Sequence, residues 1–222
     1  MSKPAWSYSR IKAFETCPKQ FYHLKVVKDY TEPETDAMSY GTAFHTAAEE
    51  YIRDNKPLEN RFLYAKPALD SLNARKGDKL CELRMGLTEG LEPCDFFADD
   101  VWWRGVIDLA ILNGEVADVL DYKTSKSARY ADTGQLELMA LALFKHYPEI
   151  QNVRAGLVFV VSRDFVKAAY SRKDDEMRLW GKWVKKYNRM QAAFDTDTWN
   201  SQPSGLCRRH CLVTSCVHNG NK

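Results

Sequence analysis

The chain has 222 residues, of which 45% are hydrophobic and 12% aromatic, enough for the packed core of one large domain or of one domain with a small appendage. Charged residues make up 28% and the net charge is +2, which excludes intrinsic disorder and a globally basic nucleic-acid surface. Residues 1–12 lack the apolar stretch of a secretory signal, and no segment approaches the roughly 20 apolar residues that span a bilayer. We therefore expect a soluble cytoplasmic protein with no membrane partner.

The first third of the chain is expected to be helical. Residues 8–28 show helical spacing of apolar side chains, which Pro18 interrupts. A second helix is expected to begin near Ser39, and its apolar stripe leaves His45 on a different face. A third helical stretch covers residues 58–75 and contains a proline that would kink or split it.

From residue 80 onward the pattern changes to short apolar or alternating runs, which predict strands. These runs cover residues 80–87, 101–112, 115–122, 156–161 and 166–170. A nearly all-apolar helix over residues 136–146 separates the third run from the fourth, and an amphipathic helix over residues 174–194 follows the last. This order predicts a mixed α/β fold of the α+β kind, with a sheet flanked by helices.

A two-residue hairpin turn is expected between the second and the third strand, at Asn113-Gly114. Counting back from a turn at these two residues places Asp108 opposite Val119, so that Asp121 is the diagonal neighbour of Asp108. Diagonal neighbours on one face of a hairpin can reach the same cation.

Side chains along this hairpin alternate between the two faces of the sheet. Asp108, Asp121 and Lys123 are therefore expected on one face and Asp118 on the other. Carboxylates on adjacent strands repel each other unless a cation neutralises them, and Mg²⁺ or Mn²⁺ suits oxygen ligands. The alternative is that Asp121 and Lys123 form a strand-end ion pair, with Asp108 at its rim.

Three short motifs carry a family resemblance: G-x-x-x-H at residues 41–45, G-V-I-D at residues 105–108 and D-x-K at residues 121–123. Together with Gln135, which matches a Q-x-x-x-Y motif with Met139 at the tyrosine position, they resemble the PD-(D/E)XK nuclease superfamily in its RecB-like branch. The resemblance implies a restriction-endonuclease-like core sheet flanked by helices. It also implies cleavage of DNA phosphodiesters with one or two divalent metals.

The resemblance assigns roles to individual positions. The implied ligands of Mg²⁺ or Mn²⁺ are His45, Asp108, Asp121 and the backbone carbonyl of Tyr122. Lys123 would be the catalytic lysine, and Gln135 would orient the site or the DNA backbone. Taken alone, His45 also fits an ordinary exposed histidine.

The six cysteines of a chain in a reducing compartment favour metal ligands or buried thiols over disulfides. Three of them are clustered near the C-terminus: Cys207, Cys211 and Cys216. Three clustered thiols need a fourth ligand to complete a metal site. Cys17, at the Pro18 helix break, is the first candidate, while His210 and His218 are nearer in sequence.

One N-terminal and three C-terminal cysteines around a nuclease core resemble the iron-sulfur members of this superfamily, the CRISPR-associated exonucleases and the AddB-type helicase-nuclease subunits. In those proteins a 4Fe-4S cluster ties the chain ends together. Zinc is the alternative metal, because tetrahedral zinc accepts the same ligands. We expect one nuclease domain over residues 1–222, with a core of about 39–195 and a cluster-binding clasp formed by residues 7–28 and 200–218.

The expected function is that of a Mg²⁺- or Mn²⁺-dependent DNA exonuclease that acts on single strands or duplex ends in recombination, repair or phage DNA metabolism. A phage-encoded protein would work in the cytoplasm of its bacterial host, and a protein partner in recombination is a further expectation. A structure-specific DNA endonuclease is one alternative. A non-catalytic, metal-stapled DNA-binding or adaptor protein is the other. The sequence leaves polarity and oligomeric state open.

Overall fold

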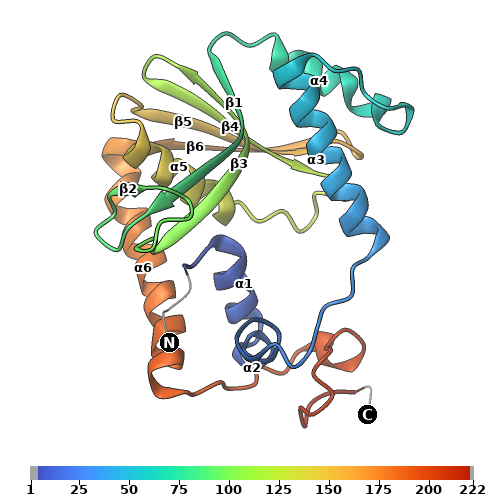
Figure 1. Cartoon of the computed structure of the whole chain (residues 1–222), viewed down its shortest axis with the longest axis vertical. Coiled ribbons are helices and arrows are strands. Elements are labelled where there is room, and N and C mark those ends of the chain that lie inside the picture. The colour runs from blue at the N-terminus through green and yellow to red at the C-terminus, as the bar shows by residue number, and fades with distance from the viewer. Residues whose placement is uncertain (1–4, 221–222) are drawn as a thin grey trace. The chain divides into compact units, whose positions relative to one another are not determined.

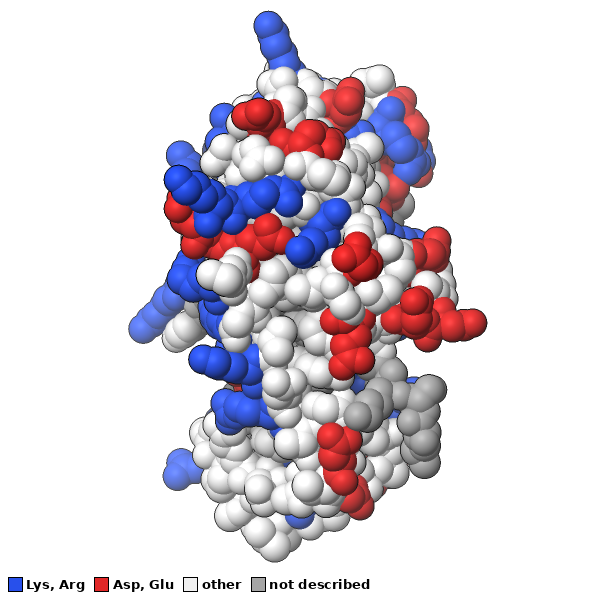
Figure 2. Space-filling view, turned by 90° about the vertical axis from the view of Figure 1, so that its left-hand side faces the viewer, with Lys and Arg blue, Asp and Glu red and all other residues white. Residues whose placement is uncertain are grey.

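The computed structural model describes residues 5–220, which form two compact units. The first unit consists mainly of residues 35–180, and the second combines residues 6–34 with residues 181–220. The face in Figure 2 carries both basic and acidic side chains, the basic ones mostly toward its left side. In the described part of the chain, no helix is long and apolar enough to cross a membrane.

A six-stranded sheet with the order β2-β1-β3-β4-β5-β6 forms the centre of the first unit (Figure 1). Its strands are β1 (Asp78–Leu87), β2 (Pro93–Cys94), β3 (Trp103–Asn113), β4 (Val116–Lys123), β5 (Asn152–Phe159) and β6 (Asp164–Ser171). Strands β4 and β5 run parallel because helix α5 (Gly134–His146) connects them, and all other neighbours are antiparallel. The mixed sheet with flanking helices confirms the predicted fold class. The two-residue strand β2 was not predicted, since it is too short to show a periodic pattern.

The turn between β3 and β4 lies one residue later than predicted. Asn113 still pairs with Val116, so that Gly114 and Glu115 form the turn, with Gly114 at a φ of 59°. A positive φ at the first turn position is typical of type II′ hairpins, where glycine adopts it without strain. The predicted register was therefore wrong by two residues, and Asp108 is level with Asp121 rather than with Val119.

One face of the sheet is covered by α3 (Asp36–Asp54), the 3₁₀ helix η2 (Asn60–Ala65) and α4 (Lys66–Asn73). Helix α3 begins three residues before the predicted Ser39, because the Thr35 side chain caps it by accepting a hydrogen bond from the Met38 N–H at 3.3 Å. The predicted helix of residues 58–75 is divided where Pro67 enters the first turn of α4, since proline is tolerated there and not inside a helix.

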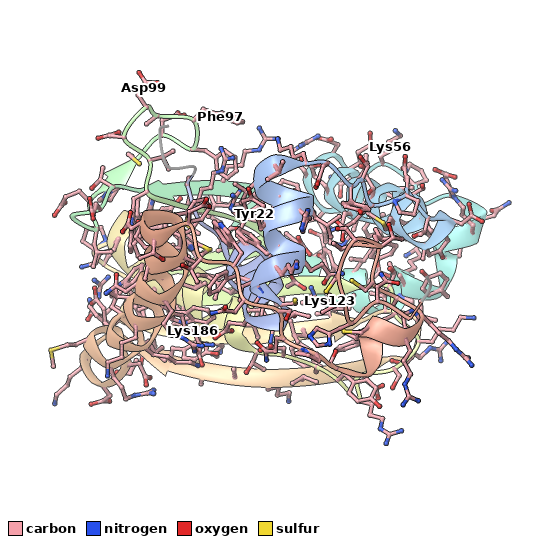
Figure 3. All side chains as sticks on the ribbon, turned by 90° about the horizontal axis from the view of Figure 1, so that it is seen from below. Tyr22, Lys56, Phe97, Asp99, Lys123 and Lys186 are labelled. Atoms are coloured by element: carbon pink, nitrogen blue, oxygen red, sulfur yellow. The ribbon has the colours of Figure 1, made fainter. Side chains whose placement is uncertain are left out.

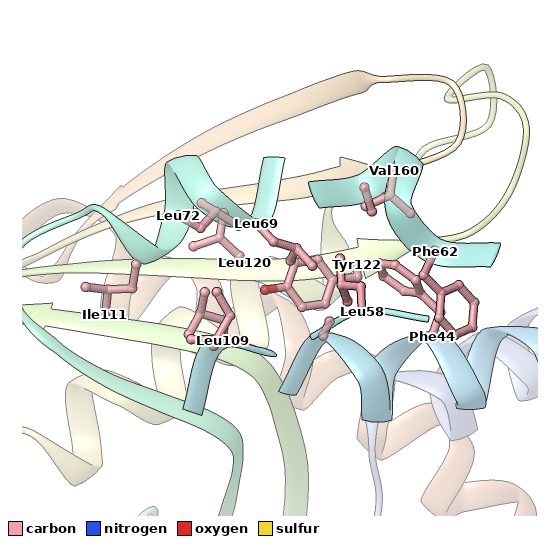
Figure 4. Close-up of a cluster of buried hydrophobic side chains, with 13 residues drawn as sticks. Phe44, Leu58, Phe62, Leu69, Leu72, Leu109, Ile111, Leu120, Tyr122 and Val160 are labelled. Atoms are coloured by element: carbon pink, nitrogen blue, oxygen red, sulfur yellow. The ribbon is translucent and has the colours of Figure 1, made fainter. Parts of the chain in front are cut away.

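A buried hydrophobic cluster joins these helices to the sheet (Figure 4). Its members are Phe44, Ala48, Ile52, Leu58, Phe62, Ala65, Leu69, Leu72, Leu109, Ile111, Leu120, Tyr122 and Val160. Phe44 and Phe62 are fully buried, and burial of such a side chain contributes about 1.5–3 kcal/mol. The cluster therefore fixes α3, and with it His45, against β3 and β4.

Helix α5 lies against the other face of the sheet, where it contacts β1, β3, β4, β5 and β6 (Figure 1). Nine of its thirteen residues are buried, as its almost uniformly apolar sequence predicts. The first residues of α6 (Arg172–Thr196) belong to the same unit, in which Arg172 bonds the carbonyls of Tyr147 and Ile150 at 2.9 Å.

The second unit contains α1 (Tyr8–Thr16), α2 (Pro18–Phe21), the π-helix η1 (Tyr22–Val27), the C-terminal part of α6 and the 3₁₀ helix η3 (Gly205–Arg208). The predicted helix of residues 8–28 breaks at Cys17, which is extended at a φ of −165° because a residue before proline avoids the helical region. Trp199 stacks on Tyr22 at 5.0 Å between ring centres, and Lys186 of α6 pairs with Glu15 of α1 at 2.5 Å. These contacts hold the two ends of the chain together within this unit.

Candidate active site

Strands β3 and β4 separate at the level of Asp108 and Asp121. Their pairing ends at Leu109 and Leu120, whereas β3 continues beside β1 and β4 continues beside β5. Oδ2 of Asp108 accepts a hydrogen bond from the backbone N–H of Tyr122 at 2.6 Å. The side chain of Asp108 thus replaces a backbone acceptor where the ladder ends, and both carboxylates lie in the fork between the strands.

Asp121 is the most deeply buried carboxylate of this fork. Its side chain is 3% exposed, and Oδ2 lies 2.6 Å from Nζ of Lys123. Burial and then the neighbouring charge of Asp108 raise the pKa of Asp121 to about 6, although Lys123 acts in the opposite direction. One lysine therefore does not fully compensate the negative charge that the fork collects.

Lys123 stands at the end of β4 (Figure 3). Besides its contact with Asp121, its Nζ donates a hydrogen bond to Oε1 of Gln135 at 3.3 Å. Gln135 is in the first turn of α5, the helix that follows the loop after β4. The lysine ammonium is thus held between two oxygens, which fixes its direction.

His45 reaches the fork from α3. Its Nδ1 lies 3.3 Å from Oδ1 of Asp108. Burial lowers the pKa of His45, but the hydrogen bond and charge of Asp108, with the charges of Asp121 and Glu82, outweigh burial and raise it overall.

Glu82 of β1 also points to the site and was missed by the sequence prediction. Glu82 lies opposite Asp108, but the backbone pairing between β1 and β3 is interrupted at this position. The backbone of Glu82 has a φ of 48°. A left-handed residue with a side chain costs about 1–2 kcal/mol, so the surrounding structure holds this backbone in place. Burial, followed by the charge of Asp108, raises the pKa of Glu82.

His45, Glu82 and Asp108 each offer a ligand atom, and these atoms lie within 4.8 Å of one another. In the described part of the chain no other group of three His, Cys, Asp or Glu donors is so close together. Arg84 lines the open side of this group, in a cavity of about 390 Å³. Imidazole nitrogen and carboxylate oxygens are suitable ligands of Mn²⁺ and Mg²⁺, so the donor set fits a divalent cation.

Comparisons with known proteins show the family and the fold of the chain. The model of the PD-(D/E)XK nuclease superfamily matches residues 5–216. The chain belongs to that superfamily. Among solved structures, this nuclease is similar to the "Putative exonuclease" from Eubacterium rectale, with a TM-score of 0.57 and 12% identity over 96% of this chain and 90% of that chain. At 12% sequence identity, this structural similarity shows that the two proteins share a fold.

SSO0001, another solved structure, has a TM-score of 0.46 and 14% identity over 99% of this chain and 89% of that chain. No curated protein matches the nuclease. Nucleases of the PD-(D/E)XK superfamily use divalent metals, and the His45, Glu82 and Asp108 group offers donors for one.

The fork brings together all six positions that the sequence predicted for the catalytic site: His45, Asp108, Asp121, Tyr122, Lys123 and Gln135. Their individual roles stay predictions. Only the backbone of Tyr122 faces the fork, because its ring is buried in the hydrophobic cluster (Figure 4). Asp118 lies on the other face, as predicted, since an error of two residues in register leaves the alternation of faces unchanged.

The four cysteines of the predicted cluster line one cavity in the second unit, together with His218. Two backbone N–H groups point to their sulfurs: Gln202 N lies 3.4 Å from Cys17 Sγ and Ser204 N lies 3.4 Å from Cys207 Sγ. His210 is not among the lining residues. Asn219 is buried below the loop and donates to the carbonyls of Cys211 and Val213, both at 2.9 Å. Thiols with N–H donors fit the role of thiolate ligands.

Proposed function

We propose that this nuclease is a Mg²⁺- or Mn²⁺-dependent DNA exonuclease. The observation that carries the proposal is the fork itself, in which Glu82, Asp108 and Asp121 converge from three adjacent strands beside one histidine and one lysine. Ionised carboxylates in such a number are stable together only when a cation neutralises them. The excess of negative charge therefore supports a metal site rather than a simple strand-end ion pair.

The residues of the fork would divide the chemistry between them. His45, Glu82, Asp108 and Asp121 would hold the divalent metal, which supplies charge stabilisation and an activated water when bound. Lys123, held by Asp121 and Gln135, would direct its ammonium to a phosphate oxygen and stabilise the charge that develops in the transition state.

The loop of residues 124–133 supports nucleic acid as the substrate. It connects Lys123 to the helix of Gln135 and exposes Lys126, Arg129 and Tyr130, with Tyr130 85% exposed. The Arg129 guanidinium lies 5.4 Å from the centre of the Tyr130 ring. Exposed cations beside an exposed ring suit phosphates and an unpaired base.

The resemblance to iron-sulfur nucleases and the name of the Eubacterium rectale neighbour support exonuclease action on single strands or duplex ends. We further propose that Cys17, Cys207, Cys211 and Cys216 bind a 4Fe-4S cluster with a structural role. Zinc is the alternative metal at the same four cysteines, since it is bound tetrahedrally by thiolates at about 2.3 Å.

The experiment for the cluster is elemental analysis of anaerobically purified protein. About four irons per chain would support it. About one zinc and no iron per chain would show that the cysteines bind zinc instead. Cys17→Ser should lose iron, whereas Cys81→Ser, at a cysteine outside the cavity, should keep it. Full metal content in Cys17→Ser would make His218 the fourth ligand.

The experiment for the activity compares end-labelled linear DNA with covalently closed circular DNA in the presence of Mg²⁺ or Mn²⁺. We expect release of short products from linear DNA only, and no cleavage by Asp121→Asn. Cleavage of the circle would make the protein an endonuclease. Binding of DNA without cleavage of either substrate would favour the non-catalytic DNA-binding or adaptor protein.

A further inference from the structure

A hollow of about 760 Å³ lies on the sheet face opposite Asp121, over β4, β5 and β6. We call it the β5–β6 groove, and its charged and aromatic lining consists of Arg75, Lys76, Asp118, Arg154, Phe165 and Lys167. It is open because α4 ends at Asn73 and leaves the strands beyond it uncovered. A cavity of this size accommodates a small ligand or a short piece of a linear one.

The floor of the groove is shaped by Gly156. Gly156 pairs with Lys167 across β5 and β6, and an added Cβ there would lie 2.1 Å from the Phe165 ring. The ring therefore rests directly on the backbone of β5, with 41% of the residue exposed. Nζ of Lys167 lies 5.6 Å from the ring centre. An exposed ring that is fixed from below offers a flat surface for stacking.

The groove carries more positive than negative charge. Asp118 is buried and binds two arginines: Arg154 through Nε at 2.6 Å and Nη2 at 3.0 Å, and Arg75 through Nη1 at 2.9 Å. One carboxylate thus orients two guanidinium groups, and the Arg154 side chain remains 67% exposed. Lys76 and Lys167 are exposed and form no ion pair with any described residue.

Four cations around one carboxylate fit an anionic ligand, and oriented guanidinium groups are suited to phosphate because they present paired N–H donors. Their orientation by Asp118 is set before a ligand arrives, which lowers the entropy lost on binding. Phosphates beside a stacking ring are the features of a nucleotide.

The shape of the groove favours a strand over a single nucleotide. A neighbouring cavity of about 410 Å³ shares Arg75 and Phe165 with it and continues to Val160 and Arg163. The N–H of Val160 donates to the carbonyl of Lys123 at 3.0 Å, so this extension ends beside the strand that carries the candidate catalytic lysine.

We propose that the β5–β6 groove binds a segment of single-stranded nucleic acid, with phosphates at the four cations and one base on Phe165. The inference rests on the proposed function for the identity of the polymer, since it adds a second contact for the same substrate. A strand held there stays attached to the protein outside the catalytic fork.

The test measures binding of fluorescein-labelled oligothymidylate by anisotropy, at several salt concentrations and in EDTA. The full chain carries Asp121→Asn, so that the probe is not cut. The groove variant is Lys76→Glu/Lys167→Glu, because these exposed lysines do not support Asp118. The control is Lys56→Glu/Lys173→Glu, which changes the net charge equally at exposed lysines outside the groove.

We expect the groove variant to bind at least about tenfold more weakly, and the slope of log affinity against log salt to fall by about 1.4, since each phosphate contact on a single strand contributes about 0.7. The control should change affinity less than about threefold. Phe165→Ala should weaken binding by about 5- to 100-fold through lost stacking. Phe165→Leu, which keeps the groove floor covered, should weaken it as well if stacking matters.

Equal weakening in the groove variant and the control, or an unchanged salt slope, would overturn the proposal. The proposal would also be overturned if thymidine monophosphate displaced the probe as effectively as unlabelled oligothymidylate does at the same nucleotide concentration. The groove would then hold a single nucleotide. The outcome is independent of cleavage. If the wild-type chain cuts no DNA but binding still depends on the groove, the groove proposal holds and the nuclease proposal fails. If cleavage is normal and the groove variant binds as well as the control, the nuclease proposal holds and the groove proposal fails.

Discussion

Two buried aspartates on β4 meet opposite environments on the two faces of the sheet. Asp118 is bound by the guanidinium groups of Arg75 and Arg154, so its charge is more than compensated. Asp121 has one lysine beside it, while Asp108 lies on the adjacent strand β3 and Glu82 on β1 beyond it, so the charge of Asp121 is not compensated. Under the two proposals, one strand prepares an anion site on one face and a cation site on the other.

The largest expected effect separates the two aspartates by activity. Asp121→Asn, Asp108→Asn and Lys123→Ala should each lower DNA cleavage by on the order of 100-fold or more, because each would remove a proposed metal ligand or the proposed transition-state charge stabilisation. Asp118→Asn is the matched control for the fork: it affects the arginines of the β5–β6 groove on the other face, so a single strand too short to reach the groove should still be cleaved. Product release from an end-labelled oligonucleotide is the measurement. If Asp118→Asn were folded but inactive while Asp121→Asn remained active, the assignment of the two faces would be reversed.

The next effect concerns the cation that we propose the fork binds. Glu82→Gln and His45→Ala should weaken Mn²⁺ affinity by at least about 10- to 100-fold, the loss typical even of residues that only support a metal ligand. Excess Mn²⁺ should restore part of the activity. Isothermal titration of the protein with Mn²⁺ measures the affinity directly, and the control is Glu50→Gln, at a residue of α3 that pairs with Lys56 and lies outside the cavity of His45 and Glu82. Unchanged affinity in Glu82→Gln would remove this residue from the metal site.

Stability without metal should change in opposite directions at the two aspartates. The pKa of Asp121 is raised to about 6 in the folded protein, so the folded state binds this proton more tightly than the unfolded state does. Its contribution to stability is present below about pH 4 and is lost as the pH rises through about 6. Asp121→Asn should therefore raise the free energy of unfolding at pH 7 by about 1–3 kcal/mol in EDTA.

Asp118→Asn should lower the free energy of unfolding by about 1–3 kcal/mol, because two arginines lose a charged hydrogen-bond acceptor. Urea unfolding at pH 4 and pH 7 checks both variants. The advantage of Asp121→Asn over the original protein should disappear at pH 4, where Asp121 is protonated. An advantage of equal size at both pH values would show that titration of Asp121 is not its cause.

The smallest effect tests what Gln135 does. Gln135→Ala removes one acceptor from Lys123, which Asp121 still holds, so kcat should fall by about fivefold, the equivalent of one hydrogen bond of about 1 kcal/mol. KM for a single-stranded oligonucleotide should stay the same if Gln135 only positions the lysine. A raised KM with unchanged kcat would instead show that Gln135 contacts the DNA backbone.

Much of the fold could be predicted from local pattern. The helix of residues 136–146 and five of the six strands have strong periodicity or continuous apolar runs, and these signals survive in the structure with shifted ends. The turn at Gly114–Glu115 was placed one residue early, because Asn113-Gly114 is itself a good turn sequence and local propensity does not decide between the two. Each side chain was still assigned to the correct face of the sheet, because an error of two residues in register leaves the alternation of faces unchanged.

Glu82 could not be predicted in the same way. An acidic residue inside an apolar strand is a visible signal, but its place beside Asp108 depends on the register between β1 and β3, which are joined by a long connection that contains β2. No short turn fixes that register, and the left-handed backbone that directs Glu82 to the fork has no local sequence signal.

The sequence by itself determined which residues of the candidate fork could be named in advance, apart from Glu82, because D-x-K, G-V-I-D and G-x-x-x-H are local patterns and alternation along a strand separates Asp121 from Asp118. Only the tertiary structure decided what surrounds each aspartate. Arg75 and Arg154 are distant from Asp118 in sequence and meet it because β4 and β5 run parallel and α4 ends above them. Charge compensation depends on distances between segments far apart in the chain, and those distances are set by packing of the whole sheet.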